Sequence, residues 1–185
     1  MPKVRLWILA AVTSGVMGAA MATTLVPMTL DEQIGEAEQI FRGRVAKMQA
    51  VEEAVGGGRR IVTRVQFAPV AIYKGDVPSP IELTFLGGRV GDTEMRVDGM
   101  PQFEVGGEYV IFVSADKQRA CPVVGWTQGT LPVDPATGVV QLSKPVAEGL
   151  RGSQTAAAAA AVAGELQVTE FEAALRERIR EAGKP

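Results

Sequence analysis

Residues 61–67 alternate between apolar and polar side chains, and this period of two is typical of a β-strand with one buried face. Val65 and Phe67 point to one side of the strand, whereas Arg64 and Gln66 point to the other. Such a strand has to bury its apolar face against other strands or against a helix. The chain must therefore contain further β-structure that packs with this segment.

Two other segments carry clear strand patterns. Residues 81–85 alternate in the same way. Residues 109–113 are apolar throughout, which is typical of a strand buried on both faces of a sheet. The remaining strands that we predict span 39–48, 94–97, 123–126 and 137–142, and we expect the last one to close the sheet.

Turn and cap signals separate these strands. The glycine triplet 56–58 predicts a hairpin tip. Pro69 predicts a bulge or bend, because proline cannot donate to a strand ladder. Ahead of the first strand, Thr29 and Glu32 have the spacing of a capping box, which predicts a short helix through about Ala37.

The composition changes near residue 149. Residues 149–168 include six consecutive alanines and are predicted to be a linker, and residues 169–185 are predicted to form an amphipathic helix. We expect this helix to pack on the sheet, with partner binding as its alternative role. Its signals are Thr169 and Glu172 for a capping box and Phe171, Leu175 and Ile179 for the apolar face.

These elements predict one mainly β domain over residues 23–148. Five or more short strands with glycine-rich turns indicate a small barrel or sandwich. The twist that Pro69 and the glycines impose favours the barrel. A short helix precedes it and an amphipathic helix follows it.

The N-terminus has the layout of a secretory signal peptide. Two basic residues precede an uncharged apolar stretch over 6–20, and Ala20-Met21-Ala22 fits the cleavage pattern. We expect a signal peptide at 1–22, an exported protein in the periplasm or outside the cell, and no stable membrane anchor after cleavage. Cleavage after Ala20 and an uncleaved anchor are the alternatives.

The composition excludes several classes of function. The chain has no histidine, which rules out Ser-His-Asp and Cys-His catalysis. Without the signal, seventeen basic residues face 21 acidic ones, a formal charge of −4 that argues against a nucleic-acid partner. We expect neither a cofactor nor a metal site. The one cysteine, Cys121, lies in an apolar setting that predicts a buried, inert thiol, with a disulfide between chains as the alternative.

Acidic residues gather in the polar stretch after the third predicted strand. Asp92, Glu94 and Asp98 could supply the paired carboxylates of a hydrolase. Their spacing matches no calcium-binding motif. We therefore expect a solvated loop at this place, with carboxylate-dependent hydrolysis as an alternative function.

The order of several short motifs resembles the netrin-like domain, whose members include the tissue inhibitors of metalloproteinases. The likeness covers about residues 23–131 and is similar in layout to a group of exported bacterial proteins of unknown function. The resemblance implies a five-stranded OB-type barrel with flanking helices. The segments that carry it are Thr23-Thr24-Leu25-Val26-Pro27, 38–45, Ile72-Tyr73-Lys74-Gly75, 107–112 and 124–129.

The resemblance also implies a binding site. In the family, the terminal amine and first carbonyl chelate the protease metal and the second residue enters the specificity pocket, roles that would fall to Thr23 and Thr24. The animal inhibitors tie this segment to the barrel with disulfides, but Thr23 and Leu25 stand at those positions here. Untethered, the segment costs about 1–2 kcal/mol per residue to order. The implied binding residues are Thr23, Thr24, Leu25, Val26 and Pro27, with Arg89, Val90, Asp92 and Glu94 in a neighbouring ridge over 89–95.

We therefore expect a non-enzymatic, exported protein-binding module, in its specific form an inhibitor-like binder of a metalloprotease. One alternative is an envelope-associated structural or interaction protein that docks through the helix at 169–185. The other is a hydrolase that uses the acidic residues of the polar stretch.

Overall fold

The computed structural model describes residues 26–117, 119–150 and 164–183 of the 185-residue chain. The predicted signal peptide, residues 23–25 and the alanine tract therefore lie outside the described residues. The elements, in chain order, are α1 (Leu30–Glu36), β1 (Ala37–Val55), β2 (Gly58–Lys74), β3 (Ile81–Leu86), β4 (Gly88–Val90), β5 (Thr93–Met95), β6 (Glu108–Ser114), the 3-10 helix η1 (Trp126–Gly129), β7 (Thr130–Asp134), β8 (Val139–Gln141), α2 (Lys144–Leu150), β9 (Glu165–Gln167) and α4 (Val168–Ala182).

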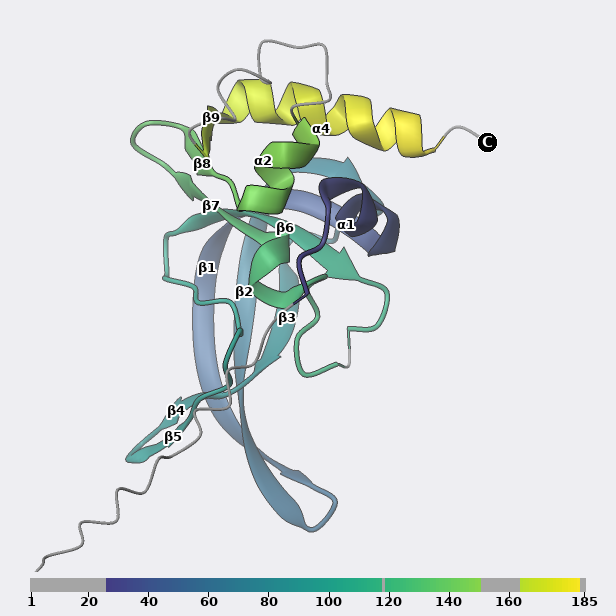
Figure 1. Ribbon diagram of the computed structural model, residues 1–185. Coiled ribbons are helices and arrows are strands. Elements are labelled where there is room, and N and C mark those ends of the chain that lie inside the picture. The colour runs from purple at the N-terminus through teal and green to yellow at the C-terminus, as the bar shows by residue number, and fades with distance from the viewer. Residues whose placement is uncertain (1–25, 118, 151–163, 184–185) are drawn as a thin grey trace, which may run out of the picture.

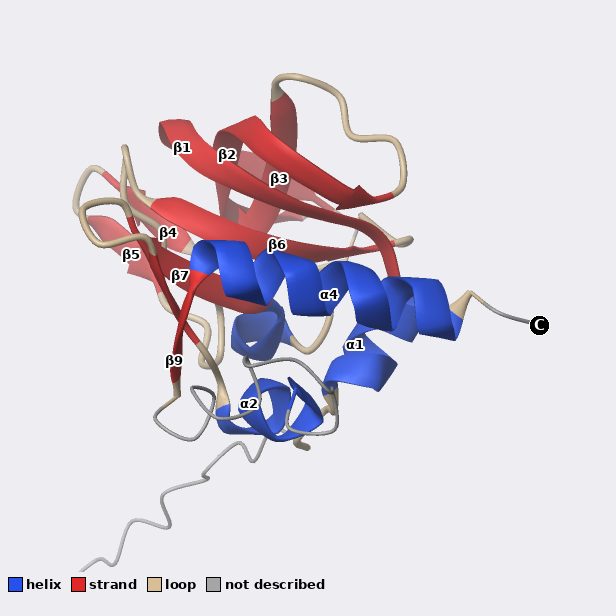
Figure 2. Ribbon diagram, turned by 90° about the horizontal axis from the view of Figure 1, so that it is seen from above, coloured by secondary structure: helices blue, strands red, loops and turns tan. Residues whose placement is uncertain are grey.

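The fold is mainly β, as predicted. Seven antiparallel strands form one sheet in the order β3-β2-β1-β6-β7-β8-β9, and β4 and β5 form a separate hairpin. Helices α1, α2 and α4 lie together on one side of the sheet (Figures 1 and 2). Within the described part of the chain, the strand ladder runs from β3 to β9 without closing. The predicted strand at 137–142 exists as β8, but it extends the sheet between β7 and β9.

The predicted capping box forms at α1. The Thr29 hydroxyl accepts a hydrogen bond of 3.2 Å from the backbone amide of Glu32. In return the Glu32 carboxylate accepts one of 2.8 Å from the backbone amide of Thr29. The helix then buries Leu30 and Ile34 against the sheet.

The hairpin of β1 and β2 is the longest feature of the sheet. It turns at the predicted glycines, with Val55 paired to Gly58 at the tip. The pairing register shifts between Arg42 and Gly43, opposite Pro69, which confirms the predicted bulge. The first strand runs further than the predicted 39–48, and cross-strand ion pairs join its polar half to β2, such as Glu53 with Arg60 at 3.2 Å.

The sheet separates two hydrophobic cores. Strand β6 is buried on both faces, as predicted: Val110 and Phe112 point into the core beneath the helices, and Tyr109 and Ile111 point into the core between β1, β2 and β3. Five aromatic rings in the second core make four contacts at centroid distances of 5.0 to 5.9 Å, and Phe103 takes part in three of them. Because the first core consists of side chains from both the helices and the sheet, the helices are an integral part of the domain.

The predicted strand at 123–126 is wrong. Val123 makes only an isolated bridge to Val113. Gly125 then adopts a left-handed conformation with φ 62°, which turns the chain into η1. Val123, Val124 and Trp126 give the segment the composition of a strand, and the local pattern does not reveal the conformation of Gly125.

The C-terminal part of the chain differs from expectation in three details. Part of the predicted linker forms β9, and Leu150, at its start, is buried at the end of α2. The predicted helix at 169–185 begins at Val168, and its N-cap Gln167 makes no side-chain cap bond. The predicted capping box is therefore absent there. The apolar face is confirmed, because Phe171 and Leu175 are fully buried in the core beneath the helices.

Candidate functional site

Val26 and Pro27 are the residues of the predicted binding segment that the structure describes, and one side chain holds the backbone around them. Gln128 of η1 donates a hydrogen bond of 3.0 Å from Nε2 to the backbone carbonyl of Val26. Its Oε1 accepts one of 2.9 Å from the backbone amide of Met28. The carboxamide thus pairs with the chain on both sides of Pro27, much as a neighbouring strand would. Val26 itself is 78% exposed, so this clamp leaves its apolar side chain facing solvent.

The helical turn that carries Gln128 is itself fixed on two sides. The backbone amide of Thr127 donates a bond of 3.3 Å to the carbonyl of Gly99, in the loop after β5. A methyl group built on Gly125 would lie 3.0 Å from the Met28 sulfur, which shows how closely the segment packs on this turn. The clamp therefore joins the N-terminal segment to the loop that follows the predicted ridge.

The predicted ridge residues form the hairpin of β4 and β5, which projects from the lower end of the sheet (Figure 1). Arg89 is paired with Glu94 and Val90 with Thr93 across the hairpin, and Asp92 lies in its exposed turn. Among the described residues, no hydrogen bond or ion pair joins this hairpin directly to Val26 or Pro27. Their connection runs through η1 and Gly99.

A cleft of about 500 Å³ lies between this hairpin and the sheet. Apolar side chains of β1, β2 and β3 line its inner wall, and charged residues of the following loop line its mouth. The lining includes two carboxylates, Glu94 and Asp98, which are the candidates for acid/base chemistry. Its apolar members include Met48, Val65, Phe85 and Phe103.

The carboxylates at this cleft lack the features of an acid/base pair. Asp92, Glu94 and Asp98 are all exposed. The Arg96 guanidinium, 2.6 Å from the Glu94 carboxylate, holds the pKa of that carboxyl below its ordinary value. A general acid needs the opposite shift. Within the described ranges, no group of three or more histidine, cysteine, aspartate or glutamate residues is placed to hold a metal.

The structure also contains a polar cluster that the sequence did not reveal. Arg42 of β1 bridges Glu108 of β6 and Glu172 of α4, the latter at 3.0 Å. The Tyr73 hydroxyl donates a hydrogen bond of 2.7 Å to the same Glu172 carboxylate. Burial, and the neighbouring Glu172 carboxylate, raise the pKa of Tyr73 above its ordinary value. The partners come from four separate elements, so no local spacing could have marked them.

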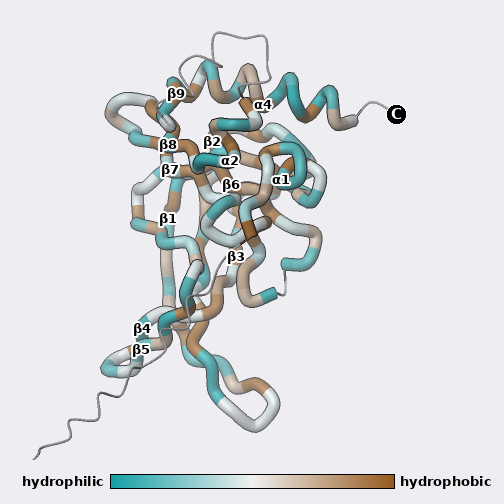
Figure 3. Tube along the Cα trace, viewed as in Figure 1, coloured by the Kyte–Doolittle hydropathy of each residue, from teal (hydrophilic) through white to brown (hydrophobic). Residues whose placement is uncertain are grey.

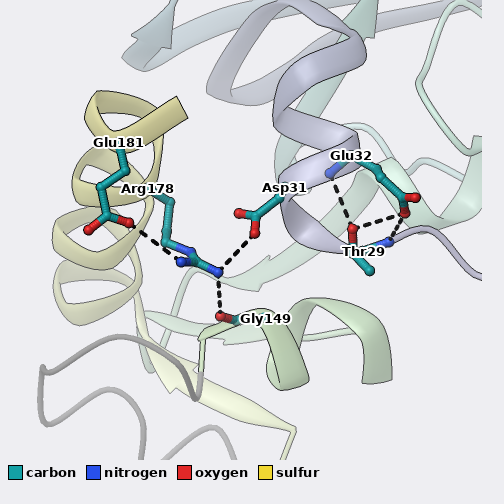
Figure 4. Close-up of polar contacts among 6 residues, drawn as sticks. All are labelled: Thr29, Asp31, Glu32, Gly149, Arg178 and Glu181. Carbon is teal, nitrogen blue, oxygen red and sulfur yellow. Dashed lines mark hydrogen bonds and ion pairs between the residues drawn. The ribbon is translucent and has the colours of Figure 1, made fainter. Parts of the chain in front are cut away.

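A second polar junction joins the three helices (Figure 4). Arg178 of α4 donates to the Asp31 carboxylate of α1 at 3.0 Å and to the Gly149 carbonyl of α2 at 3.1 Å. It also pairs with Glu181 at 3.4 Å, on its own helix. Arg178 is thus committed to packing the helices and is not free for a ligand.

Cys121 is buried, as predicted. Burial raises the pKa of its thiol to about 11. Such a thiol is almost fully protonated near neutral pH and is a poor nucleophile. The inert role that the sequence predicted therefore agrees with its surroundings.

No model of a known protein family matches this chain, and no curated protein has a significantly similar sequence. No helix within the described ranges is both long and apolar enough to cross a membrane. A functional assignment therefore has to be built from the contacts given above.

Proposed function

We propose that this chain is an exported, non-enzymatic protein-binding module that acts in the periplasm or outside the cell. Its binding surface is the N-terminal segment 23–27 together with the ridge at 89–95, and its partner is a metalloprotease. The observation that carries this proposal is the clamp of Gln128 on the backbone of Val26 and Met28.

The clamp matters because this chain has no disulfide with which to hold the segment. Each net hydrogen bond contributes about 0.5–1.5 kcal/mol, so two of them offset the backbone entropy of roughly one to two residues. Pro27 lowers the remaining cost because its ring restricts φ. Because these hydrogen bonds fix the backbone at Val26, the residues before it would extend from the domain in a defined direction.

We also propose that the sheet is a netrin-like barrel of the OB type. In support, residues 120–124 lie between β3 and β6, the two strands that barrel closure has to connect. The backbone amide of Leu86 donates to Ala120 at 2.8 Å, and that of Ser114 donates to Pro122 at 2.8 Å. These bonds bring β3 and β6 to opposite sides of one segment.

The inhibitory chemistry would come from the terminal residue. An α-amine has an ordinary pKa near 8, so a fraction of it is unprotonated at neutral pH and can ligate a metal. In this proposal the amine and carbonyl of Thr23 would occupy the partner's metal, and Thr24 would enter its specificity pocket. The ridge residues would contact the rim of the same active site.

The test is inhibition of a zinc endopeptidase by protein whose N-terminus is verified as Thr23. We expect inhibition by this form and its loss when one alanine precedes Thr23, because the added residue removes the chelating amine. Gln128→Ala should weaken inhibition by about tenfold through a less ordered segment. The matched control is Gln102→Ala, an exposed glutamine that bonds only within its own loop.

Several outcomes would count against this function. Absence of inhibition by the verified Thr23 form would contradict it, as would equal inhibition by the extended form. N-terminal sequencing of the exported protein supplies a separate check, because a chain that begins at Met21 has no free α-amine on Thr23.

A further inference from the structure

Half of strand β2 forms a free sheet edge. Strand β3 pairs only with residues 62–67 of β2, whereas β1 pairs along nearly its whole length. Among the described strands, residues 68–74 therefore have a neighbour on one side alone. Val70 and Ile72 lie in this stretch with 53% and 44% of their surfaces exposed. An exposed edge with apolar side chains is a template for pairing with another extended segment.

Helix α4 adds positive charge beside this edge. The end of β2 runs beneath α4 (Figure 1), and the two enclose a hollow of about 450 Å³ lined by Tyr73, Arg176 and Arg180, with Ala173 and Ile179. The Arg176 guanidinium lies 5.0 Å from the centre of the Tyr73 ring. Because Tyr73 belongs to β2, the hollow and the free edge are continuous.

Within the described ranges, the two arginines that line the hollow differ from Arg178 in their ion pairs. Among the residues that the structure describes, neither Arg176 nor Arg180 forms a salt bridge, in contrast with Arg178 on the same helix. Figure 3 shows hydrophilic and hydrophobic residues alternating along α4, whose apolar side is already buried in the core. The exposed side of α4 that carries Arg176 and Arg180 is thus the part available to a ligand.

We infer that the free edge of β2 binds an extended acidic segment of another protein. The segment would add as a strand beside residues 68–74 and place carboxylates on Arg176 and Arg180. Arg176 and Arg180 are one helical turn apart, about 6 Å along the axis. Alternate residues of a strand are about 6.6 Å apart, so two glutamates on one face match that spacing.

Each part of this surface has a distinct role in recognition. Backbone hydrogen bonds to the edge supply affinity that is independent of sequence, and the side-chain contacts supply selectivity. Guanidinium groups favour carboxylates because their planar donors match both oxygens. Val70 and Ile72 would contact the apolar residues of the added strand. This surface shares no residue with the segment 23–27, so it does not depend on the proposed protease-binding role.

The test uses a fluorescent nine-residue peptide of alternating valine and glutamate, measured by fluorescence anisotropy. Two control peptides accompany it: one with lysine in place of glutamate, and one with N-methylated valines that cannot donate backbone hydrogen bonds. The protein variants are R176E/R180E, the milder R176Q/R180Q and V70E/I72E. The matched control is R59E/R60E at the distant tip of the β1–β2 hairpin.

We expect the glutamate peptide to bind and to slow amide hydrogen exchange within residues 68–74. Binding should weaken about tenfold or more in both α4 variants and in V70E/I72E, and should be unchanged in R59E/R60E. The lysine and N-methylated peptides should bind at least tenfold more weakly. Circular dichroism and the unfolding midpoint verify that each variant folds.

Other results would overturn the inference. No binding by the glutamate peptide would do so, as would equal binding of either control peptide. Binding that depends on the arginines but not on the edge would show simple attraction of an anion. Arginine-dependent binding to phosphatidylglycerol vesicles, with no peptide binding, would identify a membrane surface instead.

Discussion

The Gln128 side chain accepts a hydrogen bond of 2.9 Å from the backbone amide of Met28, a residue 100 positions earlier in the chain. The same carboxamide donates to the backbone carbonyl of Val26, so one side chain bonds the backbone on both sides of Pro27. This relationship links the segment before α1 to the turn at η1. It is also the most direct target for mutation.

Gln128→Ala should loosen the segment without unfolding the domain. We expect the free energy of unfolding in urea to fall by about 1–2 kcal/mol, because two hydrogen bonds are lost. The amide of Met28 should exchange faster with solvent. Gln102→Ala should change stability by less than about 0.5 kcal/mol. An unchanged exchange rate at Met28 in Gln128→Ala would show that the clamp is not what orders the segment.

The bond between Tyr73 and Glu172 should couple α4 to β2. Tyr73→Phe and Glu172→Gln should each lower the free energy of unfolding by about 1–2 kcal/mol. The double variant should lose less than the sum, with a coupling of at least about 0.5 kcal/mol. Tyr73→Phe combined with Glu170→Gln, an exposed residue of α4, should be additive. Additivity in both pairs would contradict the proposed coupling.

Cys121 should make stability depend on pH at alkaline values. Burial raises its pKa from 9.0 to about 11, so the native state retains the thiol proton where the unfolded state has lost it. The associated stability is complete below about pH 9 and is lost as pH rises toward 11, by roughly 2 kcal/mol in total. Cys121→Ser should flatten this part of the profile in urea titrations. An identical slope in both proteins would refute the assignment.

Gly75 should tolerate a side chain poorly. Gly75 and Gly91 both have positive φ, 75° and 57°. A methyl group on Gly75 would press against the carbonyl oxygen of Glu38, whereas one on Gly91 would meet open space. Gly91→Ala should therefore lower the free energy of unfolding by only about 1–2 kcal/mol, which is the cost of placing a side chain at positive φ. Gly75→Ala should lower the free energy of unfolding by about 1–3 kcal/mol more than Gly91→Ala does, because of the clash. Equal midpoints of thermal unfolding for the two variants would argue against the clash.

Several elements could be predicted from local patterns alone. The alternation at 61–67, the apolar run at 109–113 and the capping box of Thr29 and Glu32 all correspond to elements found in the structure. Each signal spans a few residues, and its physical cause acts over that same distance. Side-chain direction alternates along a strand, and a capping box joins residues three apart.

Other features could not be predicted because their causes lie far away in the chain. Glu172 has the spacing of a capping residue after Thr169, yet it instead contacts Tyr73 and Arg42 across the helix–sheet interface. Gly125 ends the predicted strand at 123–126 through a backbone conformation that the letters do not display. The placement of the predicted binding residues Val26 and Pro27 depends on Gln128, which lies 102 positions after Val26 in the chain.

The sequence by itself determined that this domain is mainly β, that a short capped helix leads into the sheet, and that an amphipathic helix ends the chain. Only the tertiary structure decided the order of the strands, the use of both sheet faces as cores, and the free edge of β2 beside Arg176 and Arg180. The reason is physical. Periodicity states that a face must be buried, but which partner buries it depends on contacts between residues distant in sequence.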